Sequence, residues 1–89
     1  LLSKIKPGPI VELNKAIVVG YVESAQHGIE ELKKIDRLQN HYLYHAALGD
    51  FYLQGGHKSQ AKISYQNALA LTTSNQEKQL IEQKMGLCN

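Results

Sequence analysis

The stretch that decides the fold runs from Leu48 to Leu69 and reads LGDFYLQGGHKSQAKISYQNAL. Its centre, Gly55-Gly56-His57-Lys58-Ser59, has the glycines and the lysine of a phosphate-binding loop, whereas its two ends have helical periodicity. A phosphate loop needs Gly-Lys-Ser/Thr directly after a strand, because consecutive backbone N–H groups wrap the phosphates. Here His57 occupies the required Gly position and the run follows a helical pattern. We therefore interpret the two glycines as a turn between two helices.

Hydrophobic periodicity on either side of this turn predicts five helices and no strands, which makes the chain all-α. Pro9 suits the first turn of a helix, while Ser24 and Asn40 are candidate N-caps. The expected helices cover residues 9–22, a segment after Ser24 that ends near Arg37, and residues 41–54, 58–71 and 76–85. Because the first of them is apolar over most of its circumference, we expect it to be packed on several sides.

An internal repeat becomes visible when the chain is shifted against itself by 33 residues. The shift places Ala16 opposite Gly49 and Leu32 opposite Tyr65, so small residues meet small ones and bulky residues meet bulky ones. A period of this length is typical of stacked helix-turn-helix units. The sequence therefore predicts two units, residues 9–41 and 42–75, followed by a capping helix at 76–87, with residues 1–8 as a lead-in from upstream domains.

The second unit resembles a tetratricopeptide (TPR) repeat. The positions that carry this resemblance are Leu48-Gly49, Tyr52, Gly56, Ala61, Tyr65 and Ala68-Leu69. Gly49 and Ala61 would let two antiparallel helices approach closely, and Tyr65 would fill the space beside them. His45 stands where the family usually has Trp, and Thr73 stands where it usually has Pro. The resemblance implies antiparallel helix pairs that stack in a right-handed superhelix.

A second resemblance covers nearly the whole chain, from about Pro9 to Leu87. The chain is similar to the C-terminal extension of a group of extracytoplasmic-function (ECF) RNA polymerase sigma factors that carry a TPR-like domain. The matching segments are PIVELNKAIVV (9–19), HYLYHAALGDFYLQGGHKSQAKISYQNALALT (41–72) and NQEKQLIEQKM (75–85). The resemblance implies a non-catalytic regulatory domain of a bacterial transcription factor. The domains that bind polymerase and promoter DNA would lie upstream of Leu1, so DNA would be contacted only through them.

Composition and charge narrow the classes of function. The 89 residues carry ten Lys/Arg and eight Asp/Glu spread along the chain, whereas a nucleic-acid binder usually concentrates positive charge on one face. Cys88 is the single cysteine, so no internal disulfide forms and a reducing cytoplasm is expected. The longest apolar run, from Ala16 to Val22, is too short to span a bilayer, so no membrane partner is expected.

The sequence offers little for metal binding or catalysis. His41 and His45 are spaced so that both could face one metal ion, but no third ligand stands near them: Asp50 is off that face and Cys88 is remote. No serine lies in a nucleophile-elbow motif. We therefore expect no metal, no cofactor and no enzymatic activity.

The surface expected to act is the concave face, which the first helix of each pair lines in TPR arrays. Carried over by position, and with Asn14 and Tyr42 as polar groups near it, that face holds Ile10, Leu13, Asn14, Ile17, Tyr21, Tyr42, Leu43, Ala46, Asp50, Leu53 and Gln54. Such an apolar face is typical of a contact surface. Either it holds a partner segment, including one from the missing sigma-factor domains, or the last helix folds back and fills it.

Two functions from different classes follow. The first is an interaction module that tunes a sigma factor by contacting its own promoter-recognition domains, core RNA polymerase or a regulator. The second is a free-standing TPR adaptor that grips a peptide tail; such adaptors use Lys and Asn to hold a carboxylate, and this face has almost no Lys. Because two units and one helix leave apolar surface uncovered, self-association is open as well.

Overall fold

The computed structural model describes residues 9–35 and 38–88, with side chains from residue 11 onward. These residues form five α-helices and no strand: α1 (Pro9–Val22), α2 (Ala25–Lys33), α3 (Tyr42–Gln54), α4 (Lys58–Leu71) and α5 (Asn75–Gly86). The prediction of an all-α chain is thereby confirmed. The lead-in expected at residues 1–8 and the expected end of the second helix near Arg37 lie outside the described residues.

Short polar side chains fix where three of the helices begin. Ser24 accepts a hydrogen bond from the His27 backbone N–H at 3.1 Å, as predicted for the cap of α2. The cap of α3 is His41 and not Asn40, because the extended backbone of His41 places its Nδ1 3.3 Å from the Leu43 N–H. Ser74 caps α5, which therefore starts one residue earlier than expected and includes Gly86.

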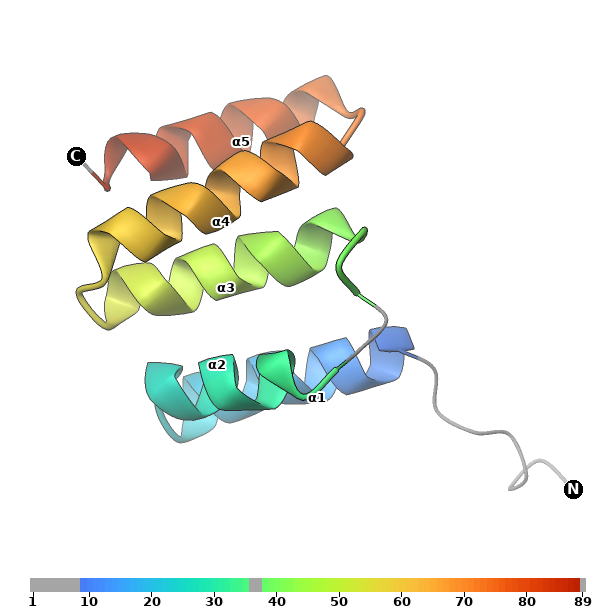
Figure 1. Cartoon of the computed structure of the whole chain (residues 1–89), viewed down its shortest axis with the longest axis vertical. Coiled ribbons are helices and arrows are strands. Elements are labelled where there is room, and N and C mark those ends of the chain that lie inside the picture. Colours follow the sequence, from blue (N-terminus) through green and yellow to red (C-terminus); the bar gives the residue numbers. More distant parts are fainter. Residues whose placement is uncertain (1–8, 36–37, 89) are drawn as a thin grey trace, which may run out of the picture.

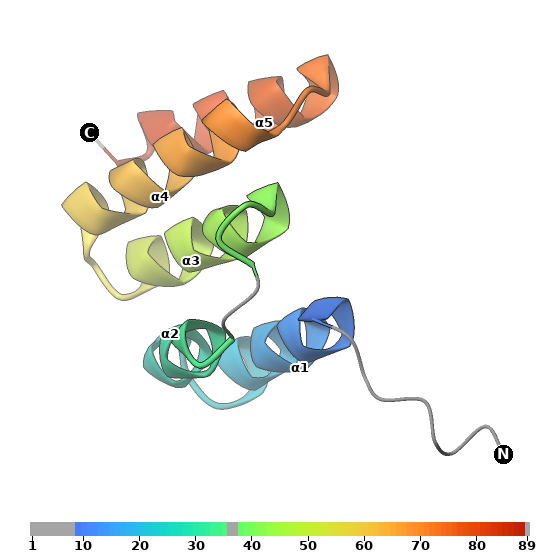
Figure 2. The same ribbon diagram turned by 45° about the vertical axis from the view of Figure 1, so that its right-hand side comes forward.

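The helices are stacked along the long axis of the molecule, with α1 and α2 side by side at one end and α5 at the other. α1 packs against α2, and α3 packs against α4. Contacts between α2 and α3 join these two pairs, and α5 lies along α4. Figure 1 shows that α1, α3 and α5 run in one direction and α2 and α4 in the other. The turned view of Figure 2 shows α1 and α2 side by side at one end, with α3 next to them and α4 and α5 at the other end. The described helices extend over 49 × 30 × 18 Å, so the arrangement is elongated and thin.

The first half of the core is organised around Phe51 of α3. Its side chain is 1% exposed, and its ring fills a notch formed by Gly20 of α1 and Gly28 of α2. A Cβ atom on Gly20 would lie 2.2 Å from Phe51 Cζ, and a Cβ on Gly28 would lie 2.7 Å from Cε2. Tyr21 packs edge-on against the same ring, with the ring centroids 5.7 Å apart. Three helices therefore meet at one aromatic side chain.

The second half of the core is organised around Tyr65 of α4, which is fully buried. A Cβ atom on Gly49 would lie 2.6 Å from the Tyr65 ring, so only glycine at this position allows α3 and α4 to approach this closely. The turn that joins them requires Gly56, whose φ is +83°. From α5, Ile81 completes this cluster together with Met85 and Cys88 near the chain end.

One expectation about α1 is wrong. Leu13 and Ala16 are buried against α2 and α3, but Val11, Val18 and Val22 are 44%, 57% and 76% exposed. The helix is therefore covered on one side only, because no described helix precedes it in the stack. None of the described helices combines the length and the apolar character needed to cross a membrane.

Candidate functional site

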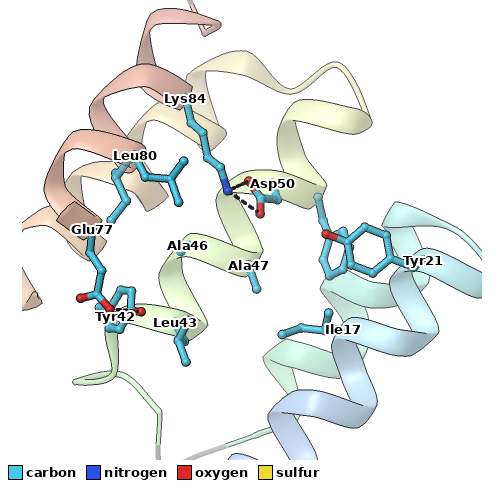
Figure 3. Close-up of a pocket in the computed structure, with 12 residues that line it drawn as sticks. Ile17, Tyr21, Tyr42, Leu43, Ala46, Ala47, Asp50, Glu77, Leu80 and Lys84 are labelled. Atoms are coloured by element: carbon cyan, nitrogen blue, oxygen red, sulfur yellow. Dashed lines mark hydrogen bonds and ion pairs between the residues drawn. The ribbon is translucent and has the colours of Figure 1, made fainter.

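A hollow that brings together expected concave-face residues is a groove between α1, α3 and α5, with a cavity volume of about 170 Å³. We call it the odd-helix groove, because α2 and α4 contribute none of its lining residues. Figure 3 shows α3 along its floor, α1 on one side and α5 on the other. Its lining consists of Ile17, Tyr21, Tyr42, Leu43, Ala46, Ala47, Asp50, Phe51, Glu77, Leu80, Ile81 and Lys84.

The walls of the groove are mostly apolar and partly open to solvent. Leu80 of α5 is 53% exposed, Leu43 of α3 is 40% exposed and Tyr21 of α1 is 65% exposed. The two alanines on the floor, Ala46 and Ala47, are small enough to leave the space between these larger side chains unfilled. Exposed apolar side chains that gather around a hollow are typical of a contact surface.

Glu77 closes one end of the groove. Its carboxylate accepts hydrogen bonds from the hydroxyls of Tyr42 on α3 and Thr72 in the α4–α5 turn. These bonds, the Thr72 bond first, lower the pKa of Glu77, because both stabilise the ionised carboxylate. Donation to Glu77 in turn raises the pKa of the Tyr42 phenol, with burial as a second cause. The local sequence Ser74-x-x-Glu77 has the pattern of a capping box, but the Glu77 side chain bonds to hydroxyls instead.

Asp50 and Lys84 close the other end. Lys84 Nζ lies 3.1 Å from Asp50 Oδ1 and 3.2 Å from Oδ2, and both side chains are about two-thirds or more buried. The hydroxyl of the buried Tyr65 donates to the same Oδ1 at 2.5 Å. Burial, followed by this bond to Asp50, raises the pKa of the Tyr65 phenol. The ion pair and the hydroxyl thus tie α3 to both α4 and α5.

The structure brings together more than half of the residues predicted for the concave face. The predicted residues that line the groove are Ile17, Tyr21, Tyr42, Leu43, Ala46 and Asp50. Of the two ways in which the groove could be filled, the last helix does not fill it: α5 packs on α4 and forms one wall.

The other predicted residues lie elsewhere. Leu13 is fully buried in the core, and Asn14 is exposed beside Val11 and Val18 on the outer side of α1. Leu53 packs into the Tyr65 cluster and Gln54 is exposed at the end of α3, and neither lines the groove. Ile10 belongs to α1, but its side chain lies outside the described part.

Sequence reasoning missed the whole α5 wall, although a signal for it existed. Shifted by 34 residues, the groove positions of α3 fall on those of α5, so that Leu43, Ala46, Ala47 and Asp50 correspond to Glu77, Leu80, Ile81 and Lys84. The last helix therefore places these residues along the groove as α3 does. Interpreting it only as a cap hid that relation.

One serine–histidine contact resembles a catalytic arrangement and is not one. Ser24 Oγ lies 2.9 Å from His27 Nδ1, and Glu23 Oε1 lies 3.7 Å from the same nitrogen. In a triad the serine and the carboxylate use different ring nitrogens. The histidine and the glutamate are more than half exposed, and Ser24 caps α2. The contact is therefore part of the N-terminal cap of α2.

Within residues 9–35 and 38–88, no three His, Cys, Asp or Glu side chains converge as a metal site would require. His45, one of the two histidines considered as ligands, is half-buried and its Nε2 lies 2.7 Å from the Gln39 carbonyl oxygen. The ring of His41 stacks on Tyr42 at the start of α3.

Comparison with known proteins identifies one similar protein and matches no family model and no solved structure. The chain is similar to an uncharacterized protein, R00370, of Rhizobium meliloti (strain 1021), with 27% identity over 85 residues. The alignment covers 94% of this chain and 20% of that protein, so the chain spans about a fifth of the length of its relative. No protein-family model matches the chain. No solved structure matches it either.

Proposed function

We propose that this domain is a non-catalytic interaction module that regulates an ECF-type RNA polymerase sigma factor in the bacterial cytoplasm. The observation that carries the proposal is the odd-helix groove, whose apolar lining comes from three helices far apart in the sequence. A continuous hollow along successive helix pairs is how helical-repeat proteins present a binding surface. The sigma-factor setting rests on the resemblance of three long segments of the sequence.

Two features support a TPR-like arrangement of the helices. The small residue at Gly49 and the ring of Tyr65 meet as the repeat signature requires. The register shift of 34 residues that relates α3 to α5 is also the length of such a repeat. On this reading the domain comprises two helix pairs and the first helix of a third.

The groove favours an intermolecular or interdomain contact over chemistry. Its charged groups are engaged: Asp50 is paired with Lys84 and Tyr65, and Glu77 accepts a bond from Tyr42. No lining residue is a nucleophile with a base beside it. The relative from Rhizobium meliloti carries four-fifths of its length outside the aligned region, which suits a domain that works within a larger chain.

A peptide-tail adaptor is the second candidate, and the charges of the groove oppose it. Such an adaptor needs a free cation to hold a carboxylate. Lys84 is the single cation among the groove-lining residues, and it is already paired with Asp50. The adaptor hypothesis therefore requires the Asp50–Lys84 pair to break.

The proposal can be tested with a photo-crosslinking amino acid at Leu43 in the native gene product, expressed in its own cells. The matched control is the same amino acid at Ile63, which is 57% exposed on α4 and lies outside the groove. We expect crosslinks from position 43, and not from 63, to core polymerase subunits or to sigma-factor domains. The proposal fails if position 43 yields no such crosslink, or if the two positions crosslink to these proteins equally.

A further inference from the structure

Glu77 carries a negative charge that no described cation neutralises. Its two hydrogen bonds come from neutral hydroxyls, those of Tyr42 and Thr72. The acid at the other end of the groove, Asp50, differs, because Lys84 lies within 3.2 Å of both of its oxygens. The charge is therefore unevenly distributed along the groove. At one end Lys84 neutralises Asp50, whereas at the other end Glu77 stays negative among the described residues.

The geometry of Glu77 leaves it able to bind further donors. An ionised carboxylate has about four lone-pair positions, and an Arg can occupy two of them in a bidentate contact. Oε1 and Oε2 of Glu77 each accept one hydroxyl bond. Figure 3 shows the carboxylate beside Tyr42 at the groove end, with Leu80 one turn further along α5. A cation bound to Glu77 would thus lie next to the apolar side chain of Leu80.

The dimensions of the groove set the size of its occupant. From Tyr42 to Asp50, α3 advances by about 12 Å, or roughly two helical turns. The cavity of about 170 Å³ is slightly larger than an engineered cavity that takes up benzene, which is about 150 Å³. It therefore accommodates one large side chain such as Phe or Leu. The exposed Leu43 and Leu80 offer contact to a neighbouring apolar side chain.

We infer that the groove takes up a short amphipathic helix of a partner protein, with one aromatic or leucine side chain in the cavity and a Lys or Arg against Glu77. Two turns of helix match the length of the groove, and residues one turn apart on a helix share a face. The inference rests on the proposed function and adds to it the chemistry of the partner. A partner helix with an acid at that position is disfavoured, because two carboxylates would meet.

The test is a selection with the full chain immobilised and a yeast-displayed library of helical peptides of about 15 residues, randomised on one face. We expect enriched peptides to combine Phe or Leu with Lys or Arg one turn away. The Glu77→Gln variant keeps the shape of the side chain and removes its charge. Peptides enriched on this variant should still carry the apolar residue but no longer the basic one. The matched control is Glu82→Gln, which removes an exposed acid of α5 outside the groove and should enrich the same peptides as the wild type.

Affinity measurements on an enriched peptide then separate charge from apolar contact. Replacing its basic residue with Gln should weaken binding to the wild type by about three- to tenfold and leave binding to Glu77→Gln unchanged. Leu80→Asp should reduce binding of every enriched peptide. The inference is overturned if no peptide is enriched, if enriched peptides carry no basic residue, or if Glu77→Gln and Glu82→Gln behave alike. Any of these results leaves the crosslinking test of the proposed function intact, because that test does not depend on the partner's charge.

Discussion

At the scale of single residues, Gly49 illustrates how one missing side chain sets the distance between two helices. The ring of Tyr65 occupies the space that any larger residue at position 49 would need. This pair could be predicted from the sequence, because both residues stand at signature positions of the segment that resembles a TPR repeat. The notch of Gly20 and Gly28 around Phe51 could not, because its three residues come from three helices and the first repeat unit is degenerate.

Gly49→Ala should destabilise the domain. The added methyl group would lie 2.6 Å from a fully buried ring, and overpacking of this kind costs about 1–3 kcal/mol, against about 1 kcal/mol regained in helix propensity. We expect a net loss of up to about 2 kcal/mol in the free energy of unfolding, measured by urea unfolding followed by circular dichroism. Gly86→Ala is the control, because its Cβ would meet no atom within 4 Å. Equal stability of the two variants would contradict the close approach of α3 and α4.

Tyr65→Phe should change the response of the domain to alkali. Because the pKa of Tyr65 is raised by burial, the folded state keeps a proton that the unfolded state loses near pH 10. Its contribution to stability is therefore complete below about pH 10 and declines as the pH rises further. Tyr65→Phe should flatten this alkaline decline and lower the free energy of unfolding at pH 7 by about 1–2 kcal/mol, through loss of the bond to Asp50. Unfolding curves at a series of pH values measure both effects.

The control for Tyr65→Phe is Tyr21→Phe, which removes the same atom from an exposed ring. Its stability at pH 7 should match that of the wild type. An unchanged alkaline decline in Tyr65→Phe would show that Tyr65 keeps an ordinary titration in the folded protein.

At the scale of helices, α5 has two structural roles. It covers the Tyr65 cluster with Ile81, and it provides one wall of the odd-helix groove with Leu80. The sequence predicted the helix and its approximate bounds, because capping residues and periodicity are local. Its second role could not be derived from local pattern, since that role depends on which neighbour the helix packs against.

The assignment of α1 residues to the concave face was limited for a related reason. Successive residues of a helix are rotated by about 100°, so an assignment by position alone fails when the rotation of the helix about its axis is unknown. Leu13 turns into the core and Asn14 turns to the outer side, whereas Ile17 reaches the groove.

Removal of α5, by ending the chain at Ser74, should expose the Tyr65 cluster. Tyr65, Ala61 and Ala68 would lose the cover that Ile81 and Met85 provide. We expect the shortened chain to self-associate or unfold, because helical repeats need a terminal helix to shield their apolar side. Analytical ultracentrifugation with circular dichroism distinguishes these results. A monomer with the thermal stability of the full chain would show that α5 is dispensable for the fold.

At the scale of the whole molecule, the two halves of the core meet at α3, which contributes side chains to both clusters. Phe51 anchors α3 to the α1–α2 pair, and Tyr52 contacts both clusters. The order of the helices followed from the sequence, because the connections are short. The degree to which the halves depend on each other did not, because it depends on how the buried side chains of α3, with Phe51 among them, pack against α1 and α2.

Phe51→Ala should uncouple the halves. Truncation of a buried Phe costs about 3–5 kcal/mol, which is a large part of the stability of a small domain. Hydrogen exchange should then show lost protection in α1 and α2 and retained protection in α3 and α4. Phe51→Leu, a milder change, should weaken protection in the same order. Uniform loss of protection over all five helices would instead indicate that the molecule unfolds as one unit.

The two polar links between α3 and α5, Tyr42–Glu77 and Asp50–Lys84, stand at opposite ends of the groove. They fix the α5 wall against the α3 floor, so under the proposed function no slow movement of that wall would precede association. Under the proposed function, binding to this surface would proceed at ordinary association rates, and changes in affinity would appear as changes in how long the complex lasts. Substitutions that break either link would lower the association rate as well. The α5 wall would then have to become ordered each time a partner binds.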